Sequence, residues 1–186
     1  MLGKLIREIV TGRDVPLRLH IGGRERREGW KIFNIQPGAN VDYVGNCTDL
    51  GRFADGSVHE IYASHVLEHL GYQRDLPRAL AEFHRVLKPG GVAMISVPDF
   101  EFICRRFVDP GLTRDQRVLL MRFAFGGQLD EHDFHFVGLT WEFLSVFLGG
   151  AGFARAERVE RFDLFTDSSA MRFGDELASL NVIAYK

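Results

Sequence analysis

The chain has 186 residues, of which 46% are hydrophobic, and its 23 basic and 25 acidic side chains give a formal charge of −2. This length and composition suit a single domain with a sizeable core, which we expect to span residues 1–186. The near balance of charge argues against nucleic acid as a partner, because polyanion binding needs a strongly basic surface.

The N-terminus and the two cysteines indicate a cytoplasmic protein. Residues 1–10 are apolar but interrupted by charge, so they are neither a secretory leader nor a membrane span, and we expect a short N-terminal helix in residues 1–16 with no transmembrane segment elsewhere. Cys47 and Cys104 are far apart and match no metal-binding spacing. Free thiols in a reducing compartment are the simplest interpretation.

The first half of the chain alternates short apolar runs with glycine or proline turns, a pattern typical of buried strands. Asp75 is a candidate N-cap for a helix with one apolar face, and Pro89 follows its end. Strands that alternate with loops and a helix in this way predict a mostly parallel sheet with helices on its faces. The expected strands are residues 17–21, 30–35, 41–44, 58–64 and 92–97.

The second half is rich in phenylalanine and predicts both helices and strands. Thr140 is a candidate cap for the last helix, which two glycines end. The last two strands are interpreted as an antiparallel pair at the edge of the sheet. We treat residues 99–138 as a helical insertion that covers a cleft. The expected elements are helices at 101–108, 114–124 and 139–148, and strands at 155–162 and 180–185.

Residues 65–69 read His-Val-Leu-Glu-His and have two opposed interpretations. As a bare string, H-x-x-E-H is the signature of inverted zincins, in which two histidines of one helix bind zinc and the glutamate is a base. The residues before it predict a buried strand, and the sequence offers no evident third ligand. We therefore predict no metal site, and a zinc hydrolase using His65, Glu68 and His69 remains only a distant alternative.

The order and spacing of several motifs resemble those of class I S-adenosylmethionine-dependent methyltransferases, in particular the small type-11-like branch. The resemblance implies a Rossmann-like, seven-stranded, mostly parallel sheet with an antiparallel edge strand, in one domain. It also implies S-adenosylmethionine as the cofactor, lying across the carboxyl ends of the first strands. The motifs are residues 19–23 with 29–30, 55–58, 64–70, 83–91, 152–153 and 179–184.

The resemblance assigns parts of the cofactor to particular loops. Gly22 and Gly23 follow the first strand and allow close backbone approach to the amino-acid end. Asp49 and Leu50 take the adenine position, where the family has an acidic or polar residue beside an apolar one. The full set of expected cofactor contacts is His20, Gly22, Gly23, Asn34, Ile35, Asp49, Leu50, Ser64, His65, Val66 and His69.

Two positions depart from the family pattern. Asn34 or Gln36 stands where the family places a carboxylate that accepts both ribose hydroxyls, and His20 replaces an acidic residue before the glycine loop. An amide can serve both hydroxyls but lacks the charge that strengthens such hydrogen bonds. These departures motivate a second hypothesis, in which the chain is a non-catalytic methyltransferase-like module with a weakened cofactor site.

Residues 130–135, Asp-Glu-His-Asp-Phe-His, are the candidates for catalysis. A histidine with a near-neutral pKa can deprotonate the acceptor, and His135 is the first candidate and His132 the second. One alternative is that this cluster only caps and pins the insertion, and a metal site made from Asp130, His132 and His135 is a distant third. We expect methyl transfer to oxygen or nitrogen of a small-molecule or saccharide-like acceptor bound under the phenylalanine-rich half. The sequence leaves the acceptor and the oligomeric state open.

Overall fold

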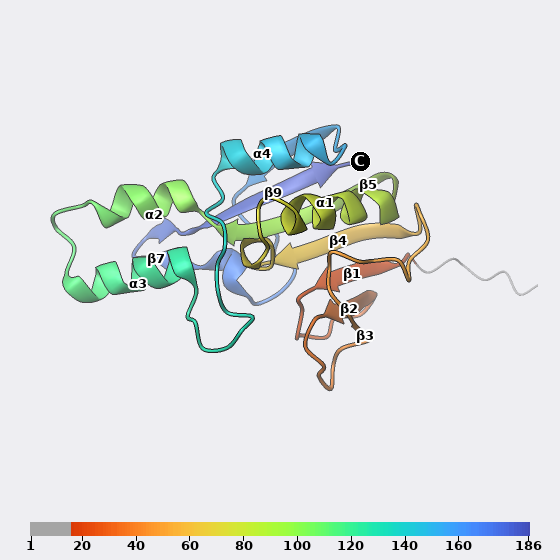
Figure 1. The fold of residues 1–186 in the computed structure, drawn as a ribbon, viewed down its shortest axis with the longest axis horizontal. Coiled ribbons are helices and arrows are strands. Elements are labelled where there is room, and N and C mark those ends of the chain that lie inside the picture. Colours follow the sequence, from red (N-terminus) through yellow and green to blue (C-terminus); the bar gives the residue numbers. More distant parts are fainter. Residues whose placement is uncertain (1–15) are drawn as a thin grey trace, which may run out of the picture.

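The computed structural model describes residues 16–186, so the helix expected in residues 1–16 lies outside the described residues apart from Pro16. A seven-stranded sheet in the order β3-β2-β1-β4-β5-β9-β6 forms the centre of the molecule (Figure 1). Its strands are β1 (Arg18–Ile21), β2 (Trp30–Asn34), β3 (Tyr43–Val44), β4 (Val58–Ser64), β5 (Leu87–Pro98), β6 (Arg155–Val159) and β9 (Ser179–Tyr185).

The sheet is parallel from β3 to β5, as the sequence predicts. The antiparallel strand is β9, which pairs with β5 on one side and β6 on the other. The expected antiparallel pair at the edge of the sheet is confirmed: β6 forms the edge, and the antiparallel strand β9 lies beside it, one position inside. The position fits the sequence of β9, in which Val182 and Ala184 are fully buried.

Different elements cover the two faces of the sheet. Helices α1 (Asp75–Val86) and α4 (Trp141–Gly150) pack side by side on one face and form the main core with the strands (Figure 1). The opposite face carries a smaller cluster of Trp30, Tyr62 and Met94, against which Phe162, Leu164 and Phe165 of the loop after β6 pack. An apolar loop thus takes the place of a helix on this face in the described part of the chain.

Two of the helix caps were predicted, with different outcomes. Thr140 accepts a hydrogen bond from Phe143 N and caps α4, as predicted. Asp75 is the first residue of α1 instead of its N-cap, because Arg74 occupies the N-cap position and makes no side-chain cap hydrogen bond. An acidic side chain in the first turn still interacts favourably with the helix dipole.

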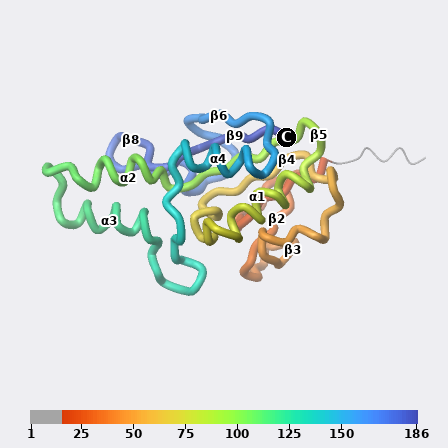
Figure 2. The backbone as a smooth tube through the Cα atoms, turned by 45° about the horizontal axis from the view of Figure 1, so that its top comes forward, coloured from red at the N-terminus to blue at the C-terminus, as the bar shows by residue number. Residues whose placement is uncertain are grey.

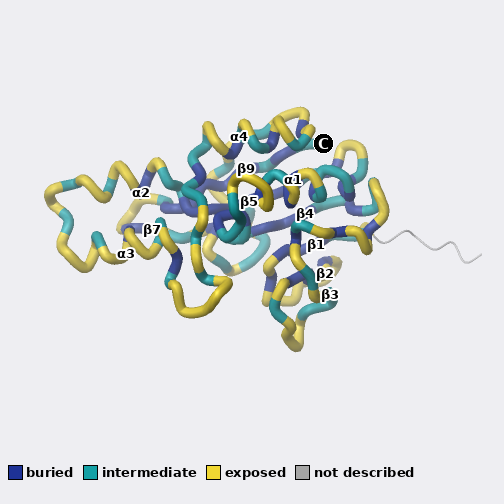
Figure 3. The backbone as a smooth tube through the Cα atoms, viewed as in Figure 1, coloured by how far each residue is buried: buried dark blue, intermediate teal, exposed yellow. Residues whose placement is uncertain are grey.

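Helices α2 (Phe100–Phe107) and α3 (Arg114–Phe125) form a hairpin that extends beyond the end of the sheet (Figures 1 and 2). Its separate small core contains Phe102, Ile103 and Leu120, and Phe173 joins it from the short hairpin of β7 (Arg172–Phe173) and β8 (Glu176–Leu177). Much of the outer surface of α2 and α3 is exposed, while the sheet strands are largely buried (Figure 3). None of the helices in residues 16–186 is long and apolar enough to span a membrane.

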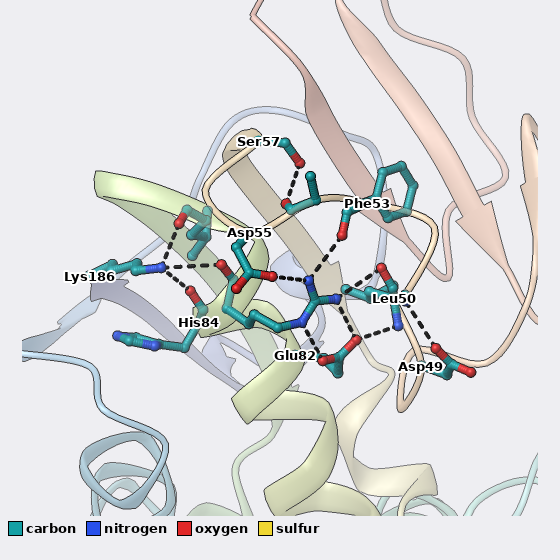
Figure 4. Close-up of polar contacts among 12 residues, drawn as sticks. Asp49, Leu50, Phe53, Asp55, Ser57, Glu82, His84 and Lys186 are labelled. Atoms are coloured by element: carbon teal, nitrogen blue, oxygen red, sulfur yellow. Dashed lines mark hydrogen bonds and ion pairs between the residues drawn. The ribbon is translucent and has the colours of Figure 1, made fainter.

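A polar network ties the loop before β4 to α1 (Figure 4). Arg85 forms ion pairs with Glu82 and Asp55 and donates to the carbonyls of Leu50 and Phe53. Glu82 in turn accepts from Leu50 N at 2.7 Å. These contacts fix the segment that runs from β3 to β4 and therefore one wall of the region at the strand ends.

Candidate functional site

A cavity of about 580 Å³ lies at the carboxyl ends of β1 to β4. In an open parallel sheet this is where the strand order reverses and where ligands bind. The volume falls within the range of pockets for small molecules and cofactors. The loops after the four strands and residues 130–136 line it, with Ile21, Gly22, Arg24, Phe33, Asn34, Ile35, Gln36, Gly45, Asn46, Cys47, Thr48, His65, Val66, His69, Leu70, Asp75, Asp130, Glu131, His132, Asp133, Phe134 and Phe136.

Gly22 is the residue of the first loop that requires glycine for two reasons. Its φ is +73°, in the left-handed region that favours glycine. A Cβ atom there would lie 2.5 Å from Cγ2 of Val66. Gly23 has a different neighbour, because its Cβ would meet the ring of His20 at 2.4 Å. Gly22 faces the cavity and Gly23 packs against the side chain of β1.

His20 lies in the core beside Tyr62 and Phe165, with the ring of Phe165 at 4.0 Å between centroids. Burial lowers the pKa of His20 to about 4, and the charges of Asp167 and Glu25 only partly oppose the shift. The imidazole is therefore neutral at pH 7. Its side chain supports the glycine loop from behind and does not line the cavity.

The side chain of Asn34 holds two loops together at the end of β2. Its Nδ2 donates to Gly23 O at 3.0 Å, and its Oδ1 accepts from Gln36 N at 2.9 Å. Both polar groups of the amide are thus used within the protein. Gln36 lies beside it on the cavity wall, where its Oε1 accepts from the guanidinium of Arg24 at 2.6 Å.

Asp49 and Leu50 lie outside the cavity lining. Leu50 is fully buried in the main core, and the Asp49 carboxylate accepts from Gly51 N and closes a turn (Figure 4). Asn46 and Thr48, earlier in the same loop, line the cavity instead. The backbone N and the Oγ1 of Thr48 both donate to Asn46 Oδ1, and these hydrogen bonds fix this wall of the cavity.

His65 directly follows β4 and has a left-handed conformation with φ of 54°. Its Nε2 lies 3.1 Å from Ser179 Oγ, and that hydroxyl donates to Ser168 O. The hydroxyl has one proton, so His65 Nε2 must donate to it, and Nδ1 carries a lone pair. Burial lowers the pKa of His65 to about 4. Ser64, one residue earlier, does not line the cavity.

Glu68 lies beneath this strand end with only 1% of its surface exposed. His65 Nδ1 lies 3.3 Å from its Oε1. Burial raises the pKa of the Glu68 carboxyl to about 8. The motif residues 67–69 form one turn of 3-10 helix, η1 (Leu67–His69), and not the long helix of a zincin.

His69 and His135 lie edge to face, with ring centroids 4.8 Å apart. His69 lines the cavity, whereas His135 stands behind it and His132 is on the cavity wall. Burial is the largest cause that lowers the pKa of both His69 and His135. His135 thus contacts a residue of the cavity wall, His69, without lining the cavity itself.

The loop between α3 and α4 brings His135 to this position. Phe136 N donates to Glu68 O at 2.8 Å, and His135 N donates to Phe125 O. Gly126 permits the close approach, since a Cβ there would overlap Asp133 O at 2.0 Å. Within the expected insertion, residues 99–138, it is the loop between α3 and α4 that covers the cavity, whereas helices α2 and α3 contribute no residue to its lining.

The structure thus divides the candidate residues into two groups. Gly22, Asn34, Ile35, His65, Val66, His69 and His132 line the cavity, whereas His20, Gly23, Asp49, Leu50, Ser64 and His135 do not. Arg24, Asn46 and Thr48 also line the cavity and were not predicted. The signal for Asn46 and Thr48 is weak, because β3 has only two residues and its end cannot be located from periodicity.

Comparison with protein families supports the assignment of the fold. Residues 23–95 match the family model described as a methyltransferase domain, which is less than half of the chain. No curated protein matches the sequence significantly. The matched segment contains the loops after β1, β2, β3 and β4 and therefore most of the cavity.

Solved structures are similar over nearly the whole chain. A SAM-dependent methyltransferase from Archaeoglobus fulgidus has a TM-score of 0.57 at 16% identity, with 92% of this chain and 86% of that chain covered. A SAM-dependent methyltransferase from Thermotoga maritima has a TM-score of 0.56 at 19% identity, with 91% and 81% covered. The 1,6-didemethyltoxoflavin-N1-methyltransferase of Burkholderia thailandensis, solved with S-adenosylhomocysteine, has a TM-score of 0.55 at 19% identity, with 92% and 71% covered.

Proposed function

The chain has the class I methyltransferase fold, and from this premise we propose that it transfers a methyl group from S-adenosylmethionine to oxygen or nitrogen of a small-molecule or saccharide-like acceptor. The observation that carries the proposal is the cavity at the carboxyl ends of β1 to β4, with Gly22 at its floor. The fold alone does not specify an activity, so the proposal depends on this site.

The residues around the cavity suit the parts of the cofactor. Gly22 lines the cavity without a side chain of its own, which suits close approach of the amino-acid end to the backbone. Gln36 suits the ribose hydroxyls better than Asn34, whose amide is already used. Asn46 and Thr48 offer polar atoms on the wall that follows β3, where the adenine ring is expected.

S-adenosylmethionine supplies a methyl group on a sulfonium, so the protein needs chiefly to align the acceptor and accept its proton. His132 is on the cavity wall between Glu131 and Asp133, in the part of the lining that the cofactor loops do not supply. We assign His132 the role of base and His135 a positioning role through His69. The carboxylates of Asp130 and Glu131 favour a polar acceptor that carries hydroxyl or amino groups.

Calorimetry with S-adenosylhomocysteine tests the cofactor site. We expect binding to the wild-type chain and at least about tenfold weaker binding to Gly22→Ala, because the methyl group would overlap Val66. Gly56→Ala is the matched control: Gly56 also has a positive φ, but a Cβ there meets nothing within 4 Å. Absence of binding to folded wild-type protein at millimolar ligand would overturn the proposal.

A second candidate function is a methyltransferase-like module that binds without catalysis. The engagement of both Asn34 polar groups favours it, because a ribose carboxylate is absent. Formation of S-adenosylhomocysteine with hydroxylated or amine acceptors separates the two candidates. Under the first, His132→Ala lowers kcat with cofactor affinity unchanged, and His135→Ala also lowers kcat. Loss of cofactor affinity in His135→Ala would indicate that this residue is only structural.

A further inference from the structure

Three potential metal ligands meet behind the cavity wall. One oxygen of Glu68 and one ring nitrogen each of His69 and His135 all lie within 4.8 Å of one another. Glu68 and His69 are consecutive residues of η1, whereas His135 is far from them in the sequence, in the loop after α3. The fold therefore brings a third potential ligand to two residues of the motif at 65–69.

The hydrogen bonds of the two histidines leave the same nitrogen free on each. His69 Nδ1 lies 3.0 Å from Phe134 O, and His135 Nδ1 lies 3.0 Å from Phe123 O. A carbonyl oxygen only accepts, so both Nδ1 atoms carry the proton and both Nε2 atoms have a lone pair. Metal-binding histidines are oriented in this way, with the second nitrogen donating to a carbonyl or carboxylate.

Glu68 supplies the independent observation that a ligand is needed. Both carboxylate oxygens are buried and have no hydrogen-bond partner among residues 16–186. His65 offers no donor, because its Nε2 proton points to Ser179 and its Nδ1 faces Glu68 with a lone pair. A buried carboxylate without a donor is strongly unfavourable, so this side chain must hold either a proton or a cation, and a divalent ion would take the place of the proton.

We propose that Glu68, His69 and His135 bind one divalent zinc-type ion through an oxygen and two Nε2 atoms. Two imidazoles and one carboxylate are an established donor set for zinc, with a fourth position left open. In a tetrahedral zinc site the ligand atoms lie about 3.3 Å apart, so the three side chains need to close by small torsional changes. His65 is not a ligand, and the pair that defines a zincin is therefore not formed.

Of the three proposed ligands, His69 lines the cavity, so the ion would lie next to it with its fourth position open. A water molecule or the oxygen or nitrogen of the acceptor can occupy that position, and the ion would then orient the acceptor toward the cofactor. The role of the ion in orienting the acceptor rests on the proposed function, whereas metal binding itself does not.

Cobalt and zinc titrations of chelator-treated protein test the site. We expect visible absorption from one Co²⁺ per chain, its displacement by one Zn²⁺, and a zinc-dependent rise in the melting temperature. Glu68→Gln keeps the shape of the side chain and His135→Ala removes one nitrogen, and each should weaken zinc binding by at least about tenfold. His132→Ala is the matched control, because it removes an imidazole of the same loop that is not in the cluster.

The outcomes separate the two proposals. Equal zinc binding by wild type, Glu68→Gln and His135→Ala would show adventitious binding elsewhere and overturn the site, as would the absence of any cobalt absorption in folded protein. Calorimetry with S-adenosylhomocysteine on the same metal-free protein reports on the cofactor site alone. The metal site can therefore fail while the proposed function stands, and the reverse also holds.

Discussion

Replacement of His20 by phenylalanine tests the role of this buried histidine. His20 is 5% exposed on β1, and its Nδ1 has no hydrogen-bond partner in the described part of the chain. Burial lowers its pKa from 6.5 to about 4, with Asp167 and Glu25 opposing the shift. His20→Phe keeps an aromatic ring of similar size beside Phe165 and removes the titrating group.

The two pKa values set the size of the effect. As the pH falls through 6.5 the unfolded chain binds a proton at His20, whereas the folded chain resists it until about pH 4. The unfolded state then holds more protons, so the free energy of unfolding of the wild type decreases as the pH is lowered. The loss from this one group is about 2 kcal/mol between pH 7 and pH 5.

Urea denaturation of both chains from pH 7 to pH 5 measures the effect. Other histidines titrate in both proteins, so the difference between the two curves isolates His20. We expect the free energy of unfolding of His20→Phe, relative to that of the wild type, to increase by about 2 kcal/mol from pH 7 to pH 5. Parallel pH profiles would refute the argument. Because His20 does not line the cavity, S-adenosylhomocysteine affinity at pH 7 should stay unchanged, and its loss would restore the sequence-based assignment of His20 to the cofactor site.

Three further substitutions test the packing around the site. Arg85→Ala should lower the free energy of unfolding by about 2 kcal/mol in urea, because two ion pairs and two carbonyl contacts are lost; an unchanged midpoint would mean that the loop before β4 is held by packing alone. Leu120→Ala should leave a cavity in the α2–α3 core and destabilise that core by about 3 kcal/mol. The expected readout is faster amide exchange in α3, while exchange in β4 stays slow. Gly126→Ala should displace the loop that carries His135 and lower zinc affinity, and intact zinc binding would contradict the role of this close approach.

The fold was predictable because its signals are local. The five parallel strands and α1 follow from short apolar runs and a single apolar helix face, and their positions are confirmed to within a few residues. The position of β9 was not predictable in this way. Its insertion between β5 and β6 depends on pairing between strands far apart in the chain. The β7–β8 hairpin has two residues per strand and gives no periodic signal.

The candidate site was harder to predict, because its residues meet only after the loops are placed. A loop residue near a strand end can face the cavity or the core, as the contrast between Thr48 and Leu50 shows. The same holds for His69 and His135, which become neighbours because Phe136 N bonds to Glu68 O. Spacing within the sequence contains no information about that contact.

The geometry of Asn34 explains why an amide stands where the family has a carboxylate. Its Nδ2 donates to Gly23 O, which an aspartate could not do, and an aspartate would instead turn an oxygen toward that carbonyl in a buried position. The amide therefore stabilises the glycine loop and the turn at Gln36 together. Under the proposed function the ribose would therefore meet no charged acceptor at Asn34, and Gln36, whose Oε1 accepts from Arg24, is the residue that we propose for the ribose hydroxyls.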